Sequence, residues 1–318
     1  MAQPIRWGIL GTGDINRKLL RGARLSSELQ VVAVGSRDQG RAAAFAKDHG
    51  IPRTFGSYEG LLADPGVDAV YICLPNSLHH PLTMTALAAG KHVLCEKPYS
   101  RHPEEVTEAF DAADRAGLVL MEAFMWRHTR QTARLLELLP RIGRLQTIRA
   151  TFSFPLGNPA NIRLRADLDG GSLMDVGCYC VSAARLLAGE EPESAFGMQE
   201  LGPSGVDLRF TGVMQFPGGV VAEFTSGFTS FSESLEAIGT TGTIRLPDPW
   251  HNTTGRFFID DEEIRLEPGN PYQDELENVG AAIRGEAAPR LGRADALGQA
   301  RTIATLYESA ATHAEVRI

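Results

Sequence analysis

Short apolar runs alternate with helical segments through the first 122 residues of the chain. Several of these runs are apolar at consecutive positions, as in strands that are buried on both faces of a parallel sheet. The apolar runs are residues 5–10, 29–34, 67–74, 92–95 and 118–122, and the helical segments are 15–25, 38–49, 77–89 and 103–116. The alternation predicts a doubly wound parallel sheet, an α/β architecture, over residues 1–122.

Local signals mark the ends of these helices. Asp38 and Ser77 precede two of them and are predicted to be N-caps. Gly50, Gly90 and Gly117 stand where three helices are expected to end, because glycine readily adopts the left-handed conformation found there.

The pattern changes after residue 122. Runs of strand length and turns alternate between residues 193 and 266, and Pro217-Gly218-Gly219 joins two of the runs. Such runs indicate a mostly antiparallel sheet with one open face. Expected strands are 145–154, 206–216, 220–228, 235–239, 243–246 and 257–266, and expected helices are 129–139, 170–187, 272–284 and 294–311. We therefore predict a second, α+β domain over residues 123–318 for substrate binding and oligomerisation.

Charge and cysteine content exclude several classes of protein. The net charge of −8 argues against a nucleic acid or an anionic membrane as the main partner. No apolar stretch approaches the roughly 18–20 residues of a membrane helix, and the N-terminus has no basic segment followed by an apolar one. The four cysteines are too few for a disulfide framework, and Cys178-x-Cys180 has no further ligands at metal-binding spacing. We expect a cytoplasmic protein without a metal site.

A glycine-rich turn directly follows the first predicted strand. It reads Gly11-Thr12-Gly13-Asp14-Ile15-Asn16 and opens the first helix, with Asn16 where the usual pattern has Gly or Ala. Such a turn lets backbone N–H groups approach a pyrophosphate at a helix N-terminus. This position predicts a dinucleotide-binding site, and an ordinary glycine turn is the alternative.

The end of the second predicted strand indicates which dinucleotide binds. NAD sites usually have an acidic residue there that binds the ribose 2′-hydroxyl. Here Ser36 and Arg37 precede Asp38, and Arg41 follows one helical turn later. A hydroxyl and guanidinium groups suit a 2′-phosphate, so we predict NADP rather than NAD. In the alternative, Asp38 turns to the ribose and Arg37 is solvated.

Two further segments follow predicted parallel strands at their carboxyl ends, where doubly wound sheets bind ligands. One begins Leu74-Pro75-Asn76 and continues to His79-His80, and the other is Glu96-Lys97-Pro98. A Lys after a buried strand needs a partner or a cavity. Lys97 is therefore a candidate site residue, although an edge position is the alternative. Histidines at a helix start, such as His79, are more often surface or capping residues.

The segment Gly170–Tyr179 contributes the last candidates. Asp175 and Tyr179 are four residues apart and would share one face of a helix. A Tyr beside a Lys suits the interconversion of a carbonyl and an alcohol, because the cation stabilises the phenolate. Alternatively, Tyr179 is an amphipathic residue at a contact between helix and sheet.

Together these motifs resemble the Gfo/Idh/MocA family of NAD(P)-dependent oxidoreductases over nearly the whole chain. The most specific of them is Ala-Gly-Lys-His-Val-Leu-Cys-Glu-Lys-Pro, residues 89–98. Tyr179 stands where many members carry His, which is similar to the branch of dimeric dihydrodiol dehydrogenase, NADP-linked D-xylose dehydrogenase and glucose-fructose oxidoreductase. Residues 121–127 and 161–163 resemble that branch as well, whereas Thr129 departs from its usual Pro.

The resemblance implies a Rossmann domain, a second domain whose open sheet forms dimer or tetramer contacts, and a sugar or cyclic vicinal diol as substrate. It places Lys97 at the nicotinamide and the substrate, and Glu96 and Pro98 around the nicotinamide. We predict hydride transfer between NADP and an aldose, a ketosugar or a diol, with Lys97 and Tyr179 as catalytic residues. The expected substrate contacts are Lys97, Trp126, Arg163, Asp175 and Tyr179, and the expected cofactor contacts are Gly11, Thr12, Gly13, Asp14, Ile15, Ser36, Arg37, Arg41, Leu74, Pro75, Asn76, His79, Glu96 and Lys97.

Two alternatives stay open. A member of the family that retains its cofactor would dismutate two sugars or cleave a glycoside through transient oxidation. A non-catalytic sensor would bind a dinucleotide without needing a pair of groups for proton transfer.

Overall fold

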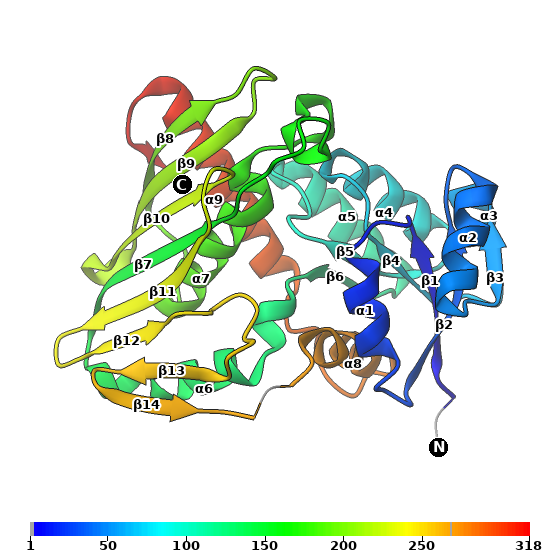
Figure 1. Ribbon diagram of the computed structural model, residues 1–318, viewed down its shortest axis with the longest axis horizontal. Coiled ribbons are helices and arrows are strands. Elements are labelled where there is room, and N and C mark those ends of the chain that lie inside the picture. The colour runs from blue at the N-terminus through cyan, green and yellow to red at the C-terminus, as the bar shows by residue number, and fades with distance from the viewer. Residues whose placement is uncertain (1–2, 268) are drawn as a thin grey trace. The chain divides into compact units, whose positions relative to one another are not determined.

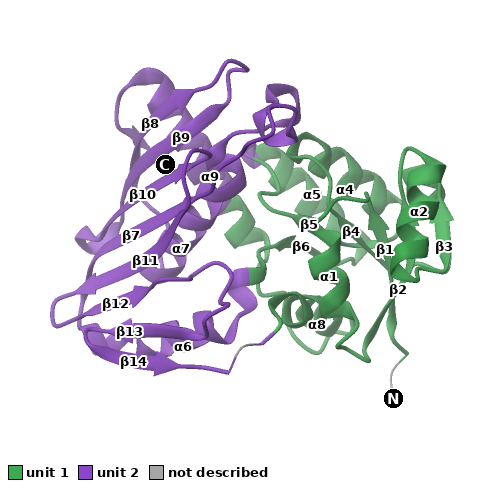
Figure 2. Cartoon of the chain, in the orientation of Figure 1, with its two compact units in different colours: residues 1–100, 104–125, 270–297 green, residues 101–103, 126–269, 298–318 purple. Residues whose placement is uncertain are grey.

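A computed structural model describes residues 3–267 and 269–318 of the chain and divides it into two compact units (Figure 2). Unit 1 contains Met1–Ser100, Glu104–Met125 and Asn270–Leu297, and unit 2 contains Arg101–Pro103, Trp126–Gly269 and Gly298–Ile318. The single boundary that we predicted at residue 122 does not describe this division, because residues 270–297 return to unit 1.

The returning segment is held by close helix packing. Helix α8 (Pro271–Ile283) packs on α1 (Asn16–Ala23). Gly22 permits this approach, since a Cβ atom there would lie 2.6 Å from the backbone nitrogen of Gln273. A contact between segments so distant in the sequence leaves no local signal.

Unit 1 is built on a six-stranded parallel sheet of order β3-β2-β1-β4-β5-β6 (Figure 1). Its strands are β1 (Ile5–Leu10), β2 (Leu29–Gly35), β3 (Arg53–Phe55), β4 (Ala69–Ile72), β5 (His92–Glu96) and β6 (Leu120–Ala123). The helices besides α1 and α8 are α2 (Gln39–His49), α3 (Tyr58–Leu62), α4 (His79–Ala88) and α5 (Pro103–Ala116). The predicted doubly wound sheet is confirmed, whereas the short elements β3 and α3 were not predicted.

Most of the predicted helix ends are confirmed. Asp38 accepts a hydrogen bond from the N–H of Arg41 at 2.7 Å as the N-cap of α2. Gly50, Gly90 and Gly117 have positive φ angles of 71°, 73° and 65°. Ser77 is not an N-cap. It lies inside a 3-10 turn (Asn76–Leu78), and α4 begins directly after that turn.

Unit 2 contains a nine-stranded sheet of order β14-β13-β12-β11-β7-β10-β9-β8-β15. Its strands are β7 (Leu145–Ser153), β8 (Ser194–Leu201), β9 (Asp207–Gln215), β10 (Val221–Gly227), β11 (Ser232–Gly239), β12 (Thr243–Leu246), β13 (Arg256–Ile259), β14 (Glu262–Arg265) and β15 (Val316–Arg317). Among the described strands of this sheet, only the β7–β10 pair is parallel, so the predicted mostly antiparallel sheet is confirmed.

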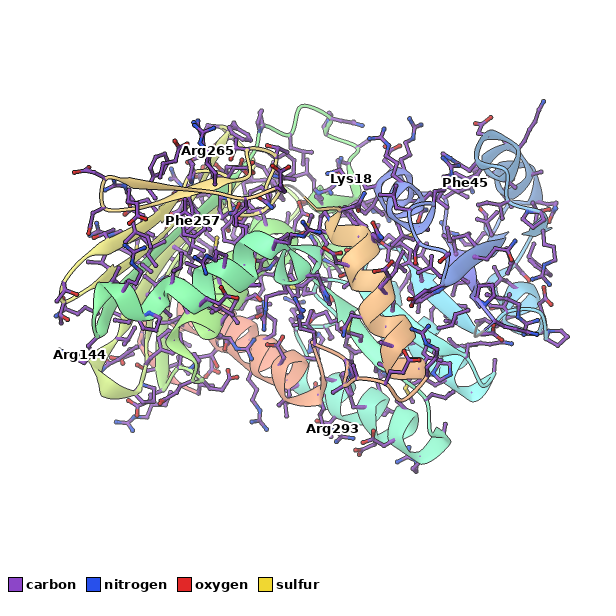
Figure 3. The ribbon with its side chains drawn as sticks, turned by 90° about the horizontal axis from the view of Figure 1, so that it is seen from below. Lys18, Phe45, Arg144, Phe257, Arg265 and Arg293 are labelled. Atoms are coloured by element: carbon purple, nitrogen blue, oxygen red, sulfur yellow. The ribbon has the colours of Figure 1, made fainter. Side chains whose placement is uncertain are left out.

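One prediction for this sheet is wrong. Residues 257–266, expected as a single strand, form the β13–β14 hairpin, which turns at Asp260 with φ 50°. Phe257 of β13 is fully buried and Arg265 of β14 is exposed (Figure 3).

Helices cover one face of this sheet. Helix α7 (Cys178–Ala188) packs on β7 and β10, and α9 (Arg293–Thr312) approaches β8, where the Ser309 hydroxyl accepts a hydrogen bond from the N–H of Gly197 (Figure 1). On the other face, alternate residues of β9 are exposed. The remaining helix, α6 (Arg130–Leu138), is capped by Thr129, which accepts a hydrogen bond from the N–H of Thr132. Among the described residues, no helix is long and apolar enough to cross a membrane.

Candidate active site

The glycine-rich turn connects β1 to α1 and is shaped by close packing. Gly11 has φ 110°, and a Cβ atom there would lie 2.9 Å from the side chain of Leu74 and 3.2 Å from Cys73 Sγ. Within the described residues, the N–H groups of Thr12, Asp14 and Ile15 have no backbone acceptor. The turn therefore presents free donors at a helix N-terminus, which is the arrangement that binds a pyrophosphate.

Asn16 is the last residue of this turn, and its side chain binds the backbone at the start of the turn. Its side chain is fully buried, and Nδ2 donates a hydrogen bond to the carbonyl oxygen of Gly11 at 3.1 Å. A Gly or Ala at this position makes no such bond. Asn16, which stands where the usual pattern has Gly or Ala, therefore stabilises the turn.

The residues expected to read the ribose lie at the end of β2. Ser36 is buried, and its hydroxyl accepts a hydrogen bond from the N–H of Asp38 at 3.3 Å. The carboxylate of Asp38 is occupied as the N-cap of α2. The guanidinium groups of Arg37 and Arg41 interact with the hydroxyl of Tyr58. Burial raises the pKa of Tyr58, and the two positive charges oppose that rise. Two positive groups thus lie near one point at this end of the strand.

His79 ties together the two loops that follow β4 and β5. Its Nε2 lies 2.8 Å from the carbonyl oxygen of Leu74, and its Nδ1 lies 2.9 Å from that of Pro98. The ring is fully buried, and burial lowers the pKa of His79. Because both nitrogens face backbone oxygens, His79 positions the loops and has no polar atom left for a ligand.

The loop after β5 begins with Glu96 and Lys97, followed by a cis peptide bond to Pro98. The Tyr71 hydroxyl and the N–H of Lys97 both donate hydrogen bonds to the Glu96 carboxylate, the latter at 3.2 Å. Glu275 of α8 lies close enough to interact with Glu96, and burial raises the pKa of Glu275 well above its usual value. Glu96 is thus held in place at the end of β5, and the half-buried Lys97 follows it directly.

In unit 2, the predicted polar residues lie on one continuous helical segment. Asp175 is part of a π-helical turn (Leu173–Gly177) that continues into α7, which carries Tyr179. π-helical turns inside helices are frequent at functional sites. Arg163 donates a hydrogen bond from Nε to the Asp175 carboxylate at 2.6 Å, so two of the residues that were predicted separately to contact substrate lie together.

Aromatic rings surround Tyr179. The ring of Phe152 lies 5.3 Å from it and that of Trp250 lies 5.8 Å from it, both edge to face. Trp126, predicted to contact substrate, is only 1% exposed and packs against Trp250 at 5.6 Å. Trp126 is therefore a buried member of the aromatic cluster and contributes to its packing.

Asp207 was not recognised in the sequence. Its buried carboxylate accepts hydrogen bonds from the Ser172 hydroxyl and the Leu173 N–H, both at 2.7 Å, and from the Tyr307 hydroxyl at 2.9 Å. Burial raises the pKa of Asp207. The side chain anchors the first residues of the π-helical turn, and only a strand-start Asp after a turn marks it in the sequence.

The fold and these residues define a class of protein, the oxidoreductases that combine a dinucleotide-binding Rossmann unit with a second unit based on a large open sheet. Residues 5–124 match the Gfo/Idh/MocA oxidoreductase family with an NAD-binding Rossmann fold, and residues 133–245 match the C-terminal domain of the same family. The chain belongs to the Gfo/Idh/MocA family.

Three similar proteins are informative. A D-xylose 1-dehydrogenase (NADP(+)) of Haloferax volcanii is 38% identical over 98% of this chain and 99% of its own. A trans-1,2-dihydrobenzene-1,2-diol dehydrogenase of Sus scrofa is 37% identical over 77% of this chain and 75% of its own. The structure of an aldose-aldose oxidoreductase from Caulobacter crescentus, complexed with glycerol, has a TM-score of 0.91 at 27% identity, covering 99% of this chain and all of that one.

Proposed function

We propose that this protein is an NADP-dependent oxidoreductase that transfers a hydride between the nicotinamide and a carbon of a sugar (an aldose or a ketosugar) or of a cyclic vicinal diol. Two observations, one in each unit, carry the proposal. Lys97 stands at the carboxyl end of β5 in the dinucleotide-binding unit, and Tyr179 stands with the Arg163–Asp175 pair in the second unit. The similar dehydrogenases act on a sugar and on a diol.

The residues at the phosphate and ribose positions fit NADP. The open N–H groups of the glycine-rich turn suit a pyrophosphate. Ser36, Arg37 and Arg41 supply a hydroxyl and two cations for a 2′-phosphate. Asp38 is committed to its helix cap and therefore does not compete for the ribose. The similar D-xylose dehydrogenase uses NADP.

The chain's own residues then have separate tasks. When bound, NADP supplies or accepts the hydride. Tyr179 exchanges a proton with the substrate oxygen through its phenol, and Lys97 orients that oxygen and stabilises the phenolate. Asp175 and Arg163, which hold each other, bind substrate hydroxyls. His79 and Glu96 position the loops that surround the nicotinamide.

Tyr179→Phe tests this assignment directly. The variant keeps the aromatic contacts with Phe152 and Trp250 but loses the proton that the phenol exchanges, so we expect kcat to fall at least 100-fold. Reduced nicotinamide is followed by absorbance with NADP+ and a panel of aldopentoses, aldohexoses and cyclic diols. An NADPH titration by fluorescence is the control and should give an unchanged Kd. Wild-type turnover by Tyr179→Phe would remove Tyr179 from the mechanism.

A second candidate function follows from the similarity to the aldose-aldose oxidoreductase. An enzyme that dismutates two sugars keeps its nucleotide between half-reactions. In that case, NADP(H) copurifies with the protein and remains after gel filtration, whereas a dehydrogenase that exchanges its cofactor is isolated without it.

We also infer that the protein is a cytoplasmic homodimer or homotetramer that associates through the open face of the nine-stranded sheet. Phe196 and Met198 of β8, Val213 of β9 and Val221 of β10 are 36–63% exposed on that face. Apolar side chains gathered on one sheet face favour burial against another subunit.

A further inference from the structure

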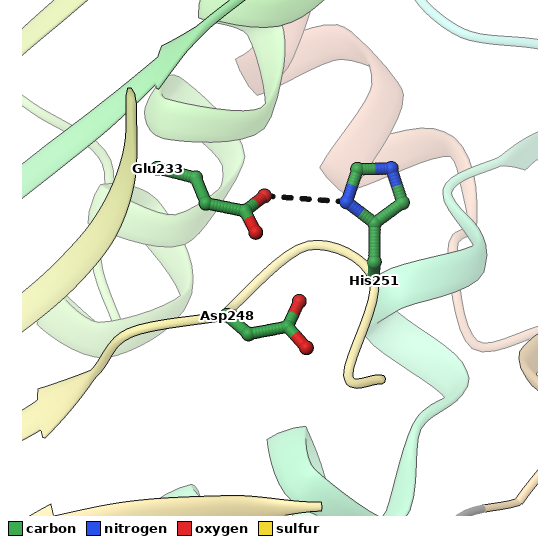
Figure 4. A group of neighbouring side chains, drawn as sticks. All are labelled: Glu233, Asp248 and His251. Atoms are coloured by element: carbon green, nitrogen blue, oxygen red, sulfur yellow. Dashed lines mark hydrogen bonds and ion pairs between the residues drawn. The ribbon is translucent and has the colours of Figure 1, made fainter. Parts of the chain in front are cut away.

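Three polar side chains of unit 2 converge, and we call them the polar trio (Figure 4). Glu233 lies on β11, whereas Asp248 and His251 lie in the segment that follows β12. One oxygen or nitrogen atom of each side chain lies within 4.8 Å of those of the other two. His251 Nδ1 is 3.2 Å from a carboxylate oxygen of Glu233.

One member of the polar trio has an unused acceptor. Only 5% of Asp248 is exposed to solvent. Its Oδ2 accepts hydrogen bonds from the N–H and the hydroxyl of Thr253 and from the N–H of Thr254. Its Oδ1 is buried and has no donor within residues 3–267 and 269–318. Figure 4 shows one carboxylate oxygen of Asp248 directed toward Glu233 and His251. A buried acceptor without a donor is unfavourable, so the trio favours a ligand that donates a hydrogen bond.

The polar trio lies next to the ring cluster that holds Tyr179. Glu233 is directly opposite Phe152 in the β11–β7 pairing, so the two side chains share a face of the sheet. The Phe152 ring contacts His251 at 5.8 Å on one side and Tyr179 at 5.3 Å on another. One aromatic ring therefore separates the trio from the proposed proton donor.

The hydrogen-bond geometry favours a hydroxyl group over a metal ion. A carboxylate only accepts hydrogen bonds, so the nitrogen that faces Glu233 carries the hydrogen and is not available as a metal ligand. The other ring nitrogen of His251 lies on the far side of the ring from Glu233 (Figure 4). The atoms left to face a ligand are carboxylate oxygens, which accept strong hydrogen bonds from hydroxyl groups.

We propose that the polar trio binds a hydroxyl group of the substrate that is remote from the carbon exchanging the hydride, and so selects among polyols. The inference rests on the proposed function, since it takes Tyr179 as the residue that exchanges a proton with the substrate. Loss of a matched hydroxyl leaves a buried carboxylate unpaired, and this is how polar sites reject analogues.

The test compares the best substrate of the sugar and diol panel with its deoxy analogues, each of which lacks one hydroxyl. In the wild type, one remote deoxy analogue should lose about 10-fold or more in kcat/KM, mainly through KM. Glu233→Gln should lower kcat/KM for the parent by a similar factor and remove most of the discrimination against that analogue. Asp248→Asn is a second variant that acts on the unused acceptor.

Glu236→Gln is the matched control, because Glu236 lies on the same strand and points to the opposite face. It should keep the wild-type discrimination. If Glu233→Gln and Asp248→Asn also keep it for every analogue, the inference is wrong while the proposed function stands. A panel without any turnover overturns both. Calorimetric binding of Zn²⁺ at one ion per chain, lost in Glu233→Gln, would assign the trio to a cation instead.

Discussion

At the scale of single residues, we expect the cofactor preference to depend on Arg37. A guanidinium on a 2′-phosphate is a charge-assisted contact worth about 1.5–3 kcal/mol. We expect Arg37→Ala to raise KM for NADP+ about 10-fold or more and to change KM for NAD+ less than about twofold. Steady-state kinetics with both cofactors measure this, and Arg21→Ala, an exposed Arg of α1, is the control. Equal effects on both cofactors would contradict a role at the 2′-phosphate.

At the scale of elements, Asp207 determines how the π-helical turn and α7 begin. Asp207→Ala removes the carboxylate that accepts hydrogen bonds from the Leu173 N–H and from the Ser172 and Tyr307 hydroxyls, which costs about 2–4 kcal/mol in the free energy of unfolding. We expect kcat to fall as well, because Asp175 and Tyr179 lie on the segment that is released. Asp207→Asn can still accept hydrogen bonds through its amide oxygen, so it should retain most of the wild-type stability and kcat. Urea denaturation measures the free energy of unfolding, and steady-state kinetics measure kcat. If Asp207→Ala and Asp207→Asn lost equal amounts of both, the anchoring role would be contradicted.

At the scale of the whole molecule, the open sheet face predicts association. Light scattering at micromolar concentration should give the mass of a dimer or tetramer. Val213→Arg places a charge in the middle of the exposed apolar row and should shift the mass toward the monomer. Leu25→Arg, at an exposed apolar position outside the sheet, is the control and should not. A monomeric wild type would refute the prediction.

Much of the fold and of the candidate site was predictable because its signals are local. Consecutive apolar residues in β1, β4 and β5 indicate a parallel sheet, and polar residues that follow such strands must lie at its carboxyl edge. Other features had weaker signals. His79 looks like a residue at a helix start, and only its two carbonyl partners show that it joins two loops.

The sequence by itself determined the two sheets, the dinucleotide turn, the Ser36–Arg37 end of β2 and the Lys97 and Tyr179 candidates, since hydrophobic period, glycine turns and motif spacing act over a few residues. Only the tertiary structure decided that residues 270–297 join unit 1, that Trp126 is buried, that Asp207 anchors the π-helical turn and that Glu233 meets His251. These outcomes depend on which distant segments pack together, and the free energy of such contacts is not encoded in any single stretch of the chain.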